Sequence, residues 1–255
     1  MGQHFLVNYG AAEKIAHTFL PVDGPILEIG PGRGILTERI LNKGANLVAV
    51  ELDRDLIPGL QERFGVNGRF KLVEDDIIRI ALSDFGDGGF KIIGNLPYNI
   101  SGALFEWLID NYKMIIMAVV TVQKEVAGRL IARSGTREYG SLSVLTGMFY
   151  SISRLFDIPP GCFTPKPKVV STVLRLLPEP RLKPDFNYAR FREFIYPCFA
   201  QKRKTLANSL KSSGGYDKSI IEKRLVSMGK SPDIRAEQLS GDELLALYGK
   251  ITGNV

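Results

Sequence analysis

The sequence predicts an α/β protein in which a doubly wound, mostly parallel sheet is followed by a small all-α domain. Short apolar runs alternate with helical patterns over the first half of the chain, an order typical of βαβ units. After a proline-rich stretch near residue 180, the apolar spacing becomes purely helical. We therefore expect two domains, 1–180 and 181–255.

The first domain contains apolar runs that predict strands at 26–30, 47–51, 70–74, 90–94 and 115–122. Helical patterns between them occupy 11–20, 34–42, 53–64 and 101–111. Uninterrupted apolar runs such as IIMAVVTV fit central strands that are covered on both faces, as in parallel sheets. The domain is completed by helices at 123–133 and 141–150 and by strand-like runs at 151–158 and 169–177.

The segment LPEPRLKP at 177–184 carries three prolines and predicts a linker. Beyond it, apolar residues recur at positions i, i+3, i+4 and i+7 of two helices: Phe191, Phe194, Ile195 and Cys198, then Leu244, Leu247, Tyr248 and Ile251. Ser240 and Glu243 have the spacing of a capping box before the second of these helices. The C-terminal domain is therefore expected to be all-α.

The net charge of +6 lies entirely in the C-terminal domain. Residues 1–180 hold 19 Lys and Arg against 19 Asp and Glu, whereas residues 181–255 hold 14 against 8, an excess of 6. This asymmetry indicates a C-terminal unit that faces a polyanion, with nucleic acid as the leading candidate. A merely solvated basic surface is the alternative.

The composition excludes several classes of protein. Two cysteines, Cys162 and Cys198, cannot form a disulfide framework and contain no C-x-x-C pair. The first residues have no secretory pattern, and the longest apolar stretch, 114–122, is far shorter than the roughly 20 residues of a membrane helix. We expect a monomeric cytoplasmic protein that binds neither a metal nor a membrane.

A glycine-rich turn, EIGPGRG at 28–34, directly follows the first strand and opens a helix. Glycines let the backbone turn tightly and approach a ligand closely, which makes Gly30 a candidate contact. The spacing is G-x-G-x-G rather than the G-x-G-x-x-G of dinucleotide enzymes, and no G-K-[ST] follows. A phosphate-cradling role is therefore disfavoured, although a tight turn alone would also explain the glycines.

Polar residues stand at the ends of the next three strands, on the edge where open α/β sheets bind ligands. Glu51 ends the second strand, where a carboxylate can accept hydrogen bonds from a ribose diol. Asp75 and Asp76 end the third, and Asn95 follows the fourth. A helix cap or a solvated charge would explain any one of them alone. Together they predict a ligand with a ribose and an adenine-like ring but no pyrophosphate, which S-adenosylmethionine fits better than NAD(P).

The sequence Asn95-Leu96-Pro97-Tyr98 predicts a pocket for a second adenine. The exocyclic amine of adenine is a poor nucleophile because its lone pair is delocalised into the ring. Two acceptors on its hydrogens, the Asn95 side-chain oxygen and the Leu96 carbonyl, would return electron density to the nitrogen. Pro97 would fix the turn and Tyr98 would stack on the base. A turn that simply ends a strand is the alternative.

An adenine enters such a pocket only after it has flipped out of its stack, so a second aromatic platform is expected. Phe163, in the loop FTPKPK, can supply that platform, unless its ring is ordinary core packing. Candidate phosphate contacts are Lys166 and Lys168 in the same loop, and Lys202, Arg203 and Lys204 at the head of an expected helix. A solvated helix start is the alternative for the last three.

Motifs along essentially the whole chain resemble the KsgA family of small-subunit rRNA adenine N6,N6-dimethyltransferases. They are GQHFL at 2–6, EIGPGRGILT at 28–37, VELDRDL at 50–56, NLPYNIS at 95–101, QKEVAGRL at 123–130, FTPKPKV at 163–169, FAQKRKTLANSL at 199–210 and RAEQLS at 235–240. The resemblance implies a Rossmann-like class I methyltransferase fold with a mostly parallel seven-stranded sheet. One departure is His4, where the family usually has asparagine.

The resemblance also implies residue roles and a substrate. S-adenosylmethionine would contact His4, Leu6, Gly30, Glu51, Asp76 and Asn95, with Asp75 as a substitute for Asp76. Asn95, Leu96, Pro97 and Tyr98 would hold the target adenine, and Phe163 would stack on it. The family transfers two methyl groups to each of two adjacent adenosines in the 3′-terminal hairpin of small-subunit rRNA during ribosome assembly. The expected partners are therefore small-subunit rRNA and the pre-30S particle.

Two other functions compete with this one. The related Erm methyltransferases act on large-subunit rRNA, but their motif more often has N-I-P-Y or N-I-P-F, and their tails do not usually resemble KRKTLANSL. A binding protein of the same fold, either a mitochondrial transcription factor or a ribosome-assembly factor, is the second alternative. The intact NLPY motif and glycine loop favour an enzyme.

Overall fold

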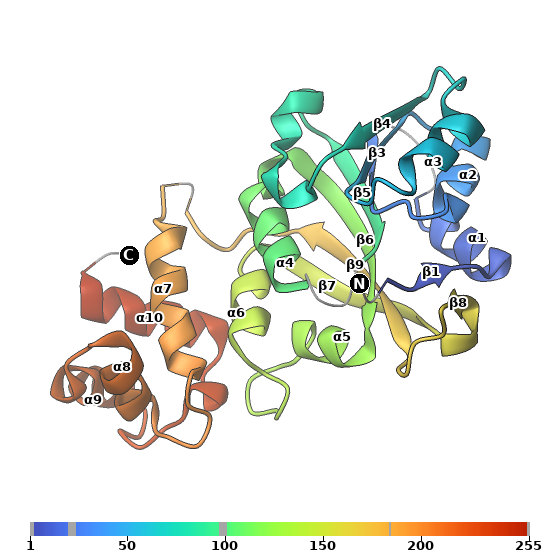
Figure 1. Ribbon diagram of the computed structural model, residues 1–255. Coiled ribbons are helices and arrows are strands. Elements are labelled where there is room, and N and C mark those ends of the chain that lie inside the picture. The colour runs from blue at the N-terminus through green and yellow to red at the C-terminus, as the bar shows by residue number, and fades with distance from the viewer. Residues whose placement is uncertain (1–2, 20–23, 97–100, 184, 254–255) are drawn as a thin grey trace. The chain divides into compact units, whose positions relative to one another are not determined.

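The computed structural model describes residues 3–19, 24–96, 101–183 and 185–253, which form two compact units (Figure 1). The first unit lies within 1–127 and 151–178, and the second within 128–150 and 179–255. The segment 128–150, which the sequence places in the first domain, thus groups with the second. Its helix α6 (Ser141–Gly147) packs against two helices of that unit, α7 (Tyr188–Phe199) and α10 (Gly241–Thr252).

The first unit is built on a seven-stranded sheet with the order β4-β3-β2-β5-β6-β9-β7. The strands are β2 (Ile26–Ile29), β3 (Leu47–Glu51), β4 (Phe70–Glu74), β5 (Phe90–Asn95), β6 (Ile115–Gln123), β7 (Tyr150–Ile158) and β9 (Ser171–Pro178). The pairs from β4 to β6 are all parallel, and β9 runs antiparallel to β6. The mostly parallel seven-stranded sheet is therefore confirmed.

Helices connect these strands, at α1 (Tyr9–His17), α2 (Ile35–Asn42), α3 (Ile57–Phe64), α4 (Ser101–Asp110) and α5 (Lys124–Leu130). Helix α1 begins after Asn8, whose side chain accepts a hydrogen bond from the backbone N–H of Ala11 at 2.8 Å. Helix α3 begins later than the apolar pattern at 53–64 predicts, with Pro58 in its first turn. Proline suits the first turn because backbone N–H groups there have no partner within the helix, so the missing N–H of proline costs no hydrogen bond.

The chain winds away from the middle of the sheet in two directions. Strands β3 and β4 follow β2 on one side, whereas β5 and β6 extend the sheet on the other side. Strands β2 and β5 are parallel neighbours, so the loops at their carboxyl ends diverge and leave a crevice. Open α/β sheets bind ligands at such a switch point.

A two-stranded ribbon lies outside the main sheet. Strand β1 (Phe5–Leu6) pairs antiparallel with β8 (Phe163–Thr164). Leu6 and Phe163 are both buried in the hydrophobic core of the first unit. The sequence did not predict this ribbon because strands of two residues are too short to show a period.

The second unit contains α6, α7 and α10 together with α8 (Leu206–Gly214) and α9 (Lys218–Ser227). Its core includes the rings of Phe191 and Phe194, whose centroids each lie 5.4 Å from that of Tyr248. The expected capping box is present, since Ser240 and Glu243 exchange side-chain and backbone hydrogen bonds at the start of α10. The all-α C-terminal architecture is confirmed for the described residues.

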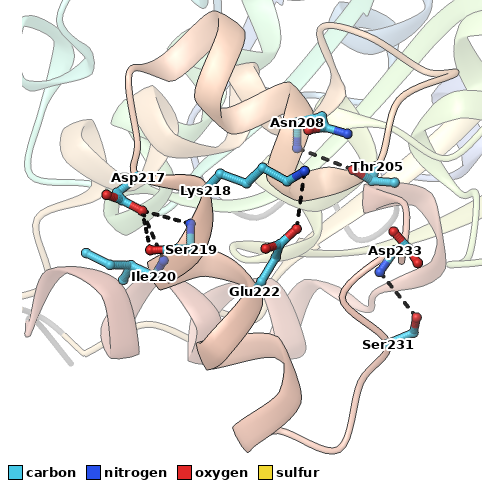
Figure 2. Close-up of polar contacts among 9 residues, drawn as sticks. All are labelled: Thr205, Asn208, Asp217, Lys218, Ser219, Ile220, Glu222, Ser231 and Asp233. Atoms are coloured by element: carbon cyan, nitrogen blue, oxygen red, sulfur yellow. Dashed lines mark hydrogen bonds and ion pairs between the residues drawn. The ribbon is translucent and has the colours of Figure 1, made fainter.

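Side-chain caps begin both α8 and α9 (Figure 2). Thr205 accepts a hydrogen bond from the backbone N–H of Asn208, and Asp217 accepts from those of Ser219 and Ile220. These contacts satisfy N–H groups that a helix start leaves unpaired. Among the residues that the structure describes, no helix is long and apolar enough to cross a membrane.

Candidate cofactor and substrate site

A pocket opens at the carboxyl ends of β2, β3, β4 and β5, at the switch point of the sheet. Its lining comes from the N-terminal segment, the glycine turn and the strand ends, and includes Gln3, His4, Phe5, Leu6, Glu28, Gly30, Gly32, Arg33, Glu51, Leu52, Asp75, Asp76, Asn95 and Leu96. The structure thus brings together all the expected cofactor residues, which lie within the first unit.

The glycine turn requires glycine for two different reasons. Gly30, Gly32 and Gly34 have φ angles of 63°, 59° and 77°, in the left-handed region that other residues rarely adopt. A Cβ on Gly34 would lie 2.5 Å from the ring of Phe64, so this glycine also lets the turn lie close to α3. A Cβ on Gly30 would meet no atom within 4 Å, although Gly30 lines the pocket. The turn therefore leaves open space at Gly30, beside the pocket, which suits the close approach of a cofactor.

The carboxylate of Glu51 is fixed at the end of β3. Oε2 accepts a hydrogen bond from the backbone N–H of Gly32 at 3.0 Å, and Oε1 accepts from those of Leu52 and Asp53 at 3.0 and 2.9 Å. Only 4% of this residue is exposed. A carboxylate has about four acceptor positions, so the three protein donors leave capacity for a ligand hydroxyl. This geometry fits the expected grip on a ribose diol.

Glu28 is a pocket residue to which the sequence analysis gave no role. It lies in the middle of β2 with 1% of its surface exposed, and its Oε2 accepts a hydrogen bond from Thr37 Oγ1 at 2.7 Å. The pKa of Glu28 is raised to about 7, chiefly by burial, with the negative charge of Glu51 acting in the same direction and the hydrogen bonds to Thr37 in the opposite one. A usable signal was present, because an acidic residue inside an apolar strand run indicates a special environment.

Asp75 and Asp76 both line the pocket, just beyond β4. Asp75 Oδ1 accepts a hydrogen bond from the backbone N–H of Asp76 at 2.7 Å. Asp76 Oδ1 accepts from the N–H of Ile78 at 3.2 Å and caps a short 3-10 helix, Ile77–Arg79. Asp76 thus has the capping role that the sequence offered as an alternative, while its position still suits a cofactor contact.

Asn95 occupies the last position of β5. Its Nδ2 donates a hydrogen bond to the carbonyl oxygen of His4 at 2.9 Å. A carbonyl oxygen can only accept, so this contact fixes which end of the amide donates and makes the other end the acceptor. Leu96 follows with its N–H donating to the Thr121 carbonyl at 3.0 Å. Pro97 and Tyr98 lie outside the described residues, so their expected roles stay predictions.

His4 connects the N-terminal segment with the loop after β8. Its Nδ1 lies 2.6 Å from the carbonyl oxygen of Pro165 and therefore donates a hydrogen bond to it. Through its own carbonyl, His4 also accepts from Asn95. The residue thus joins the chain before β1 to both β5 and the Phe163 loop, in addition to lining the pocket.

The ring of Phe163 is 3% exposed and is packed in the core beside Leu6. The burial of Phe163 matches the core-packing alternative. Its ring could stack on a base only after the residues that cover it had moved. Lys166 and Lys168, in contrast, are exposed on the same loop.

The exposed residues Lys202, Arg203 and Lys204 lie in a turn between α7 and α8. The expectation that they head a helix was wrong, because Thr205 caps α8 and the helix begins at Leu206. Among the described residues, no group of three or more His, Cys, Asp and Glu side chains could hold a metal ion.

The fold and the pocket define a class I methyltransferase. A dimethyladenosine transferase from Plasmodium falciparum has this fold, with a TM-score of 0.78 and 24% identity over 98% of this chain and 99% of that one. The 23S rRNA methyltransferase ErmE gives a TM-score of 0.70 and 25% identity, covering 97% and 99% of the two chains. The predicted Rossmann-like class I fold is therefore confirmed.

The family model for ribosomal RNA adenine dimethylase matches residues 1–238, and the chain belongs to this family. It is thus an enzyme that methylates adenine in ribosomal RNA with S-adenosylmethionine as the methyl donor. The ribosomal RNA small subunit methyltransferase A of Acidobacterium capsulatum is 40% identical over 252 residues, covering 97% of this chain and 89% of the relative. The protein of the same name from Geobacter metallireducens is 40% identical over 256 residues, covering 97% and 92%.

Proposed function

We propose that this enzyme transfers two methyl groups to N6 of each of two adjacent adenosines in the 3′-terminal hairpin of small-subunit rRNA. Its substrate is the pre-30S particle during ribosome assembly in the cytoplasm, and the enzyme acts as a monomer. The observation that carries the proposal is the 40% identity to small-subunit methyltransferases over nearly the whole chain, against 25% to the 23S rRNA enzyme ErmE.

The cofactor, when bound, supplies an electrophilic methyl group on a sulfonium centre. Glu51 accepts hydrogen bonds from the ribose diol, and its three backbone contacts prevent it from turning away. Gly30 admits the ligand close to the backbone, where a Cβ would otherwise project. Asp76 contacts the adenine end, while His4, Leu6 and Asn95 border the pocket on the side of the N-terminal segment.

The target amine is held by acceptors of this chain. The Asn95 amide is oriented by the His4 carbonyl, which leaves its oxygen to accept from the amine of the adenine. The Leu96 carbonyl accepts the second hydrogen. Both contacts draw the hydrogens away from nitrogen and return its lone pair toward the methyl donor. No strong base is needed, since the amine becomes acidic only after it has been methylated.

Aromatic and basic side chains complete the substrate site. Pro97 fixes the turn after Leu96. Tyr98 stacks on one face of the flipped adenine, and Phe163 stacks on the other face after the residues that cover its ring have moved. Contacts with phosphates come from Lys166, Lys168, Lys202, Arg203 and Lys204.

Methyl mapping tests the proposal. The enzyme is incubated with labelled S-adenosylmethionine and with small or large ribosomal subunits that lack the modification, and modified nucleotides are located by mass spectrometry. We expect N6,N6-dimethyladenosine at two adjacent positions near the 3′ end of the small-subunit RNA. Label in large-subunit RNA alone would support the Erm-type alternative. Absence of label from both RNAs would support the non-catalytic one.

A further inference from the structure

Three contacts hold the loop at 131–140 against the rest of the second unit. Lys202 Nζ lies 3.4 Å from the carbonyl oxygen of Arg137 and donates to it. The Gly135 N–H donates to the Glu237 carbonyl at 2.6 Å. The ring of Tyr139 meets that of Phe199 edge-on, with centroids 5.8 Å apart. The loop is thus held beside the turn that joins α7 and α8.

This arrangement places the backbone of Arg137 beside the basic turn, and Arg133 belongs to the same loop. Arg133 and Arg137 of the loop are exposed, as are Lys202, Arg203 and Lys204 of the turn. We call these five residues the loop–turn surface. Within the described parts of the chain, none of the five forms an ion pair with a carboxylate. An exposed carboxylate, Glu138, directly follows Arg137 in the loop.

The three cations of the turn are placed unfavourably for the folded protein taken alone. Lys202, Arg203 and Lys204 come directly before the N-terminus of α8, where the helix dipole favours negative charge. A bound polyanion would offset this penalty, which indicates that the cations serve binding.

We propose that the loop–turn surface is one continuous site for the phosphate backbone of RNA, to which Arg133 and Arg137 contribute along with the turn. The inference deepens the proposed function and rests on it. It extends the RNA-binding region beyond 181–255, because the segment 128–150 belongs to the second unit. Contacts of this kind position the RNA without reading its sequence.

The test compares two variants that lose the same charge. One is Arg133→Gln with Arg137→Gln, and its control is Lys223→Gln with Arg224→Gln, an exposed pair on α9. Affinity for small-subunit RNA is measured by filter binding from 50 to 300 mM salt, as required for a salt slope. Equal melting temperatures for the two variants ensure that only binding is compared.

Two lost phosphate contacts should flatten the slope of log K against log salt by about 1.4–1.8, and weaken binding roughly tenfold near 0.15 M salt. We expect this change for the loop variant and a smaller one for the control. The KM for RNA should rise in parallel with the loss of affinity. An unchanged slope, or equal changes in both variants, would overturn the proposal. The binding test stays separate from the proposed methylation, because it is decided by RNA affinity even if methyl mapping fails.

Discussion

Replacing Glu28 with glutamine should change the pH dependence of folding in a defined direction. The folded pKa is about 7 against an ordinary value of 4.5, a difference of 2.5. At 1.36 kcal/mol per pKa unit this corresponds to about 3 kcal/mol. The folded state binds the proton more tightly, so this stability is fully present below pH 4.5 and is lost as the pH rises through 7.

Glutamine has no charge at any pH in this range, and its amide oxygen can still accept the hydrogen bond from Thr37. The free energy of unfolding of Glu28→Gln minus that of the wild type should therefore be small near pH 4. It should rise to about 3 kcal/mol at pH 8. Titrating groups that do not interact with Glu28 are common to both proteins and cancel in the difference.

Urea unfolding of the cofactor-free proteins, followed by tryptophan fluorescence, measures this difference. Trp107 is the single tryptophan, is 4% exposed, and donates to the Ile80 carbonyl, so it reports on the first unit. A difference that stays flat from pH 4 to 8 would show that Glu28 titrates as a solvated carboxyl. A difference that falls with pH would show that its charged form is the favoured one. Either result would refute the assignment of Glu28 as a buried carboxyl destabilised by its charge.

Four further variants test the site and the basic turn. Gly34→Ala should lower the free energy of unfolding in urea by about 2–5 kcal/mol, because the strain of the left-handed backbone adds to the overlap of the new Cβ with Phe64. Gly30→Ala should lose more cofactor affinity than stability. Equal stability losses in the two variants would contradict this. Glu51→Gln should lower cofactor affinity at least about tenfold by calorimetry, because both Glu51 oxygens accept from backbone N–H groups and an amide NH2 would oppose one of these donors; an unaltered affinity would remove Glu51 from the site. Neutralising Lys202, Arg203 and Lys204 to glutamine should reduce both RNA affinity and its salt dependence, and an unaltered slope would count against the turn.

Much of the fold could be predicted because its elements are long and periodic. The strands 47–51 and 70–74 match β3 and β4 to the residue, since turn residues bound their apolar runs. The ribbon of β1 and β8 could not be found this way, because two residues show no period. The grouping of the segment 128–150 with the second unit could not be predicted for a related reason: a helical pattern predicts an apolar face but not the surface that it packs against.

The pocket was predictable to the extent that it follows from strand ends. Glu51, Asp76 and Asn95 meet because parallel strands bring their carboxyl ends to one edge. The raised pKa of Glu28 depends on burial under neighbouring elements, which the sequence does not state. The covered ring of Phe163 likewise depends on packing against Leu6, a residue that is distant in the chain.

The Asn95→Ala variant tests most directly whether the amide at the end of β5 activates the target amine. The purified variant and the wild-type enzyme are given unmodified small subunits and S-adenosylmethionine, and N6,N6-dimethyladenosine is counted by mass spectrometry. We expect methyl transfer to be abolished while RNA affinity stays nearly the same, because Asn95 lines the pocket and its proposed contact is with the amine rather than with phosphates. Dimethylation retained at the wild-type level would contradict this role.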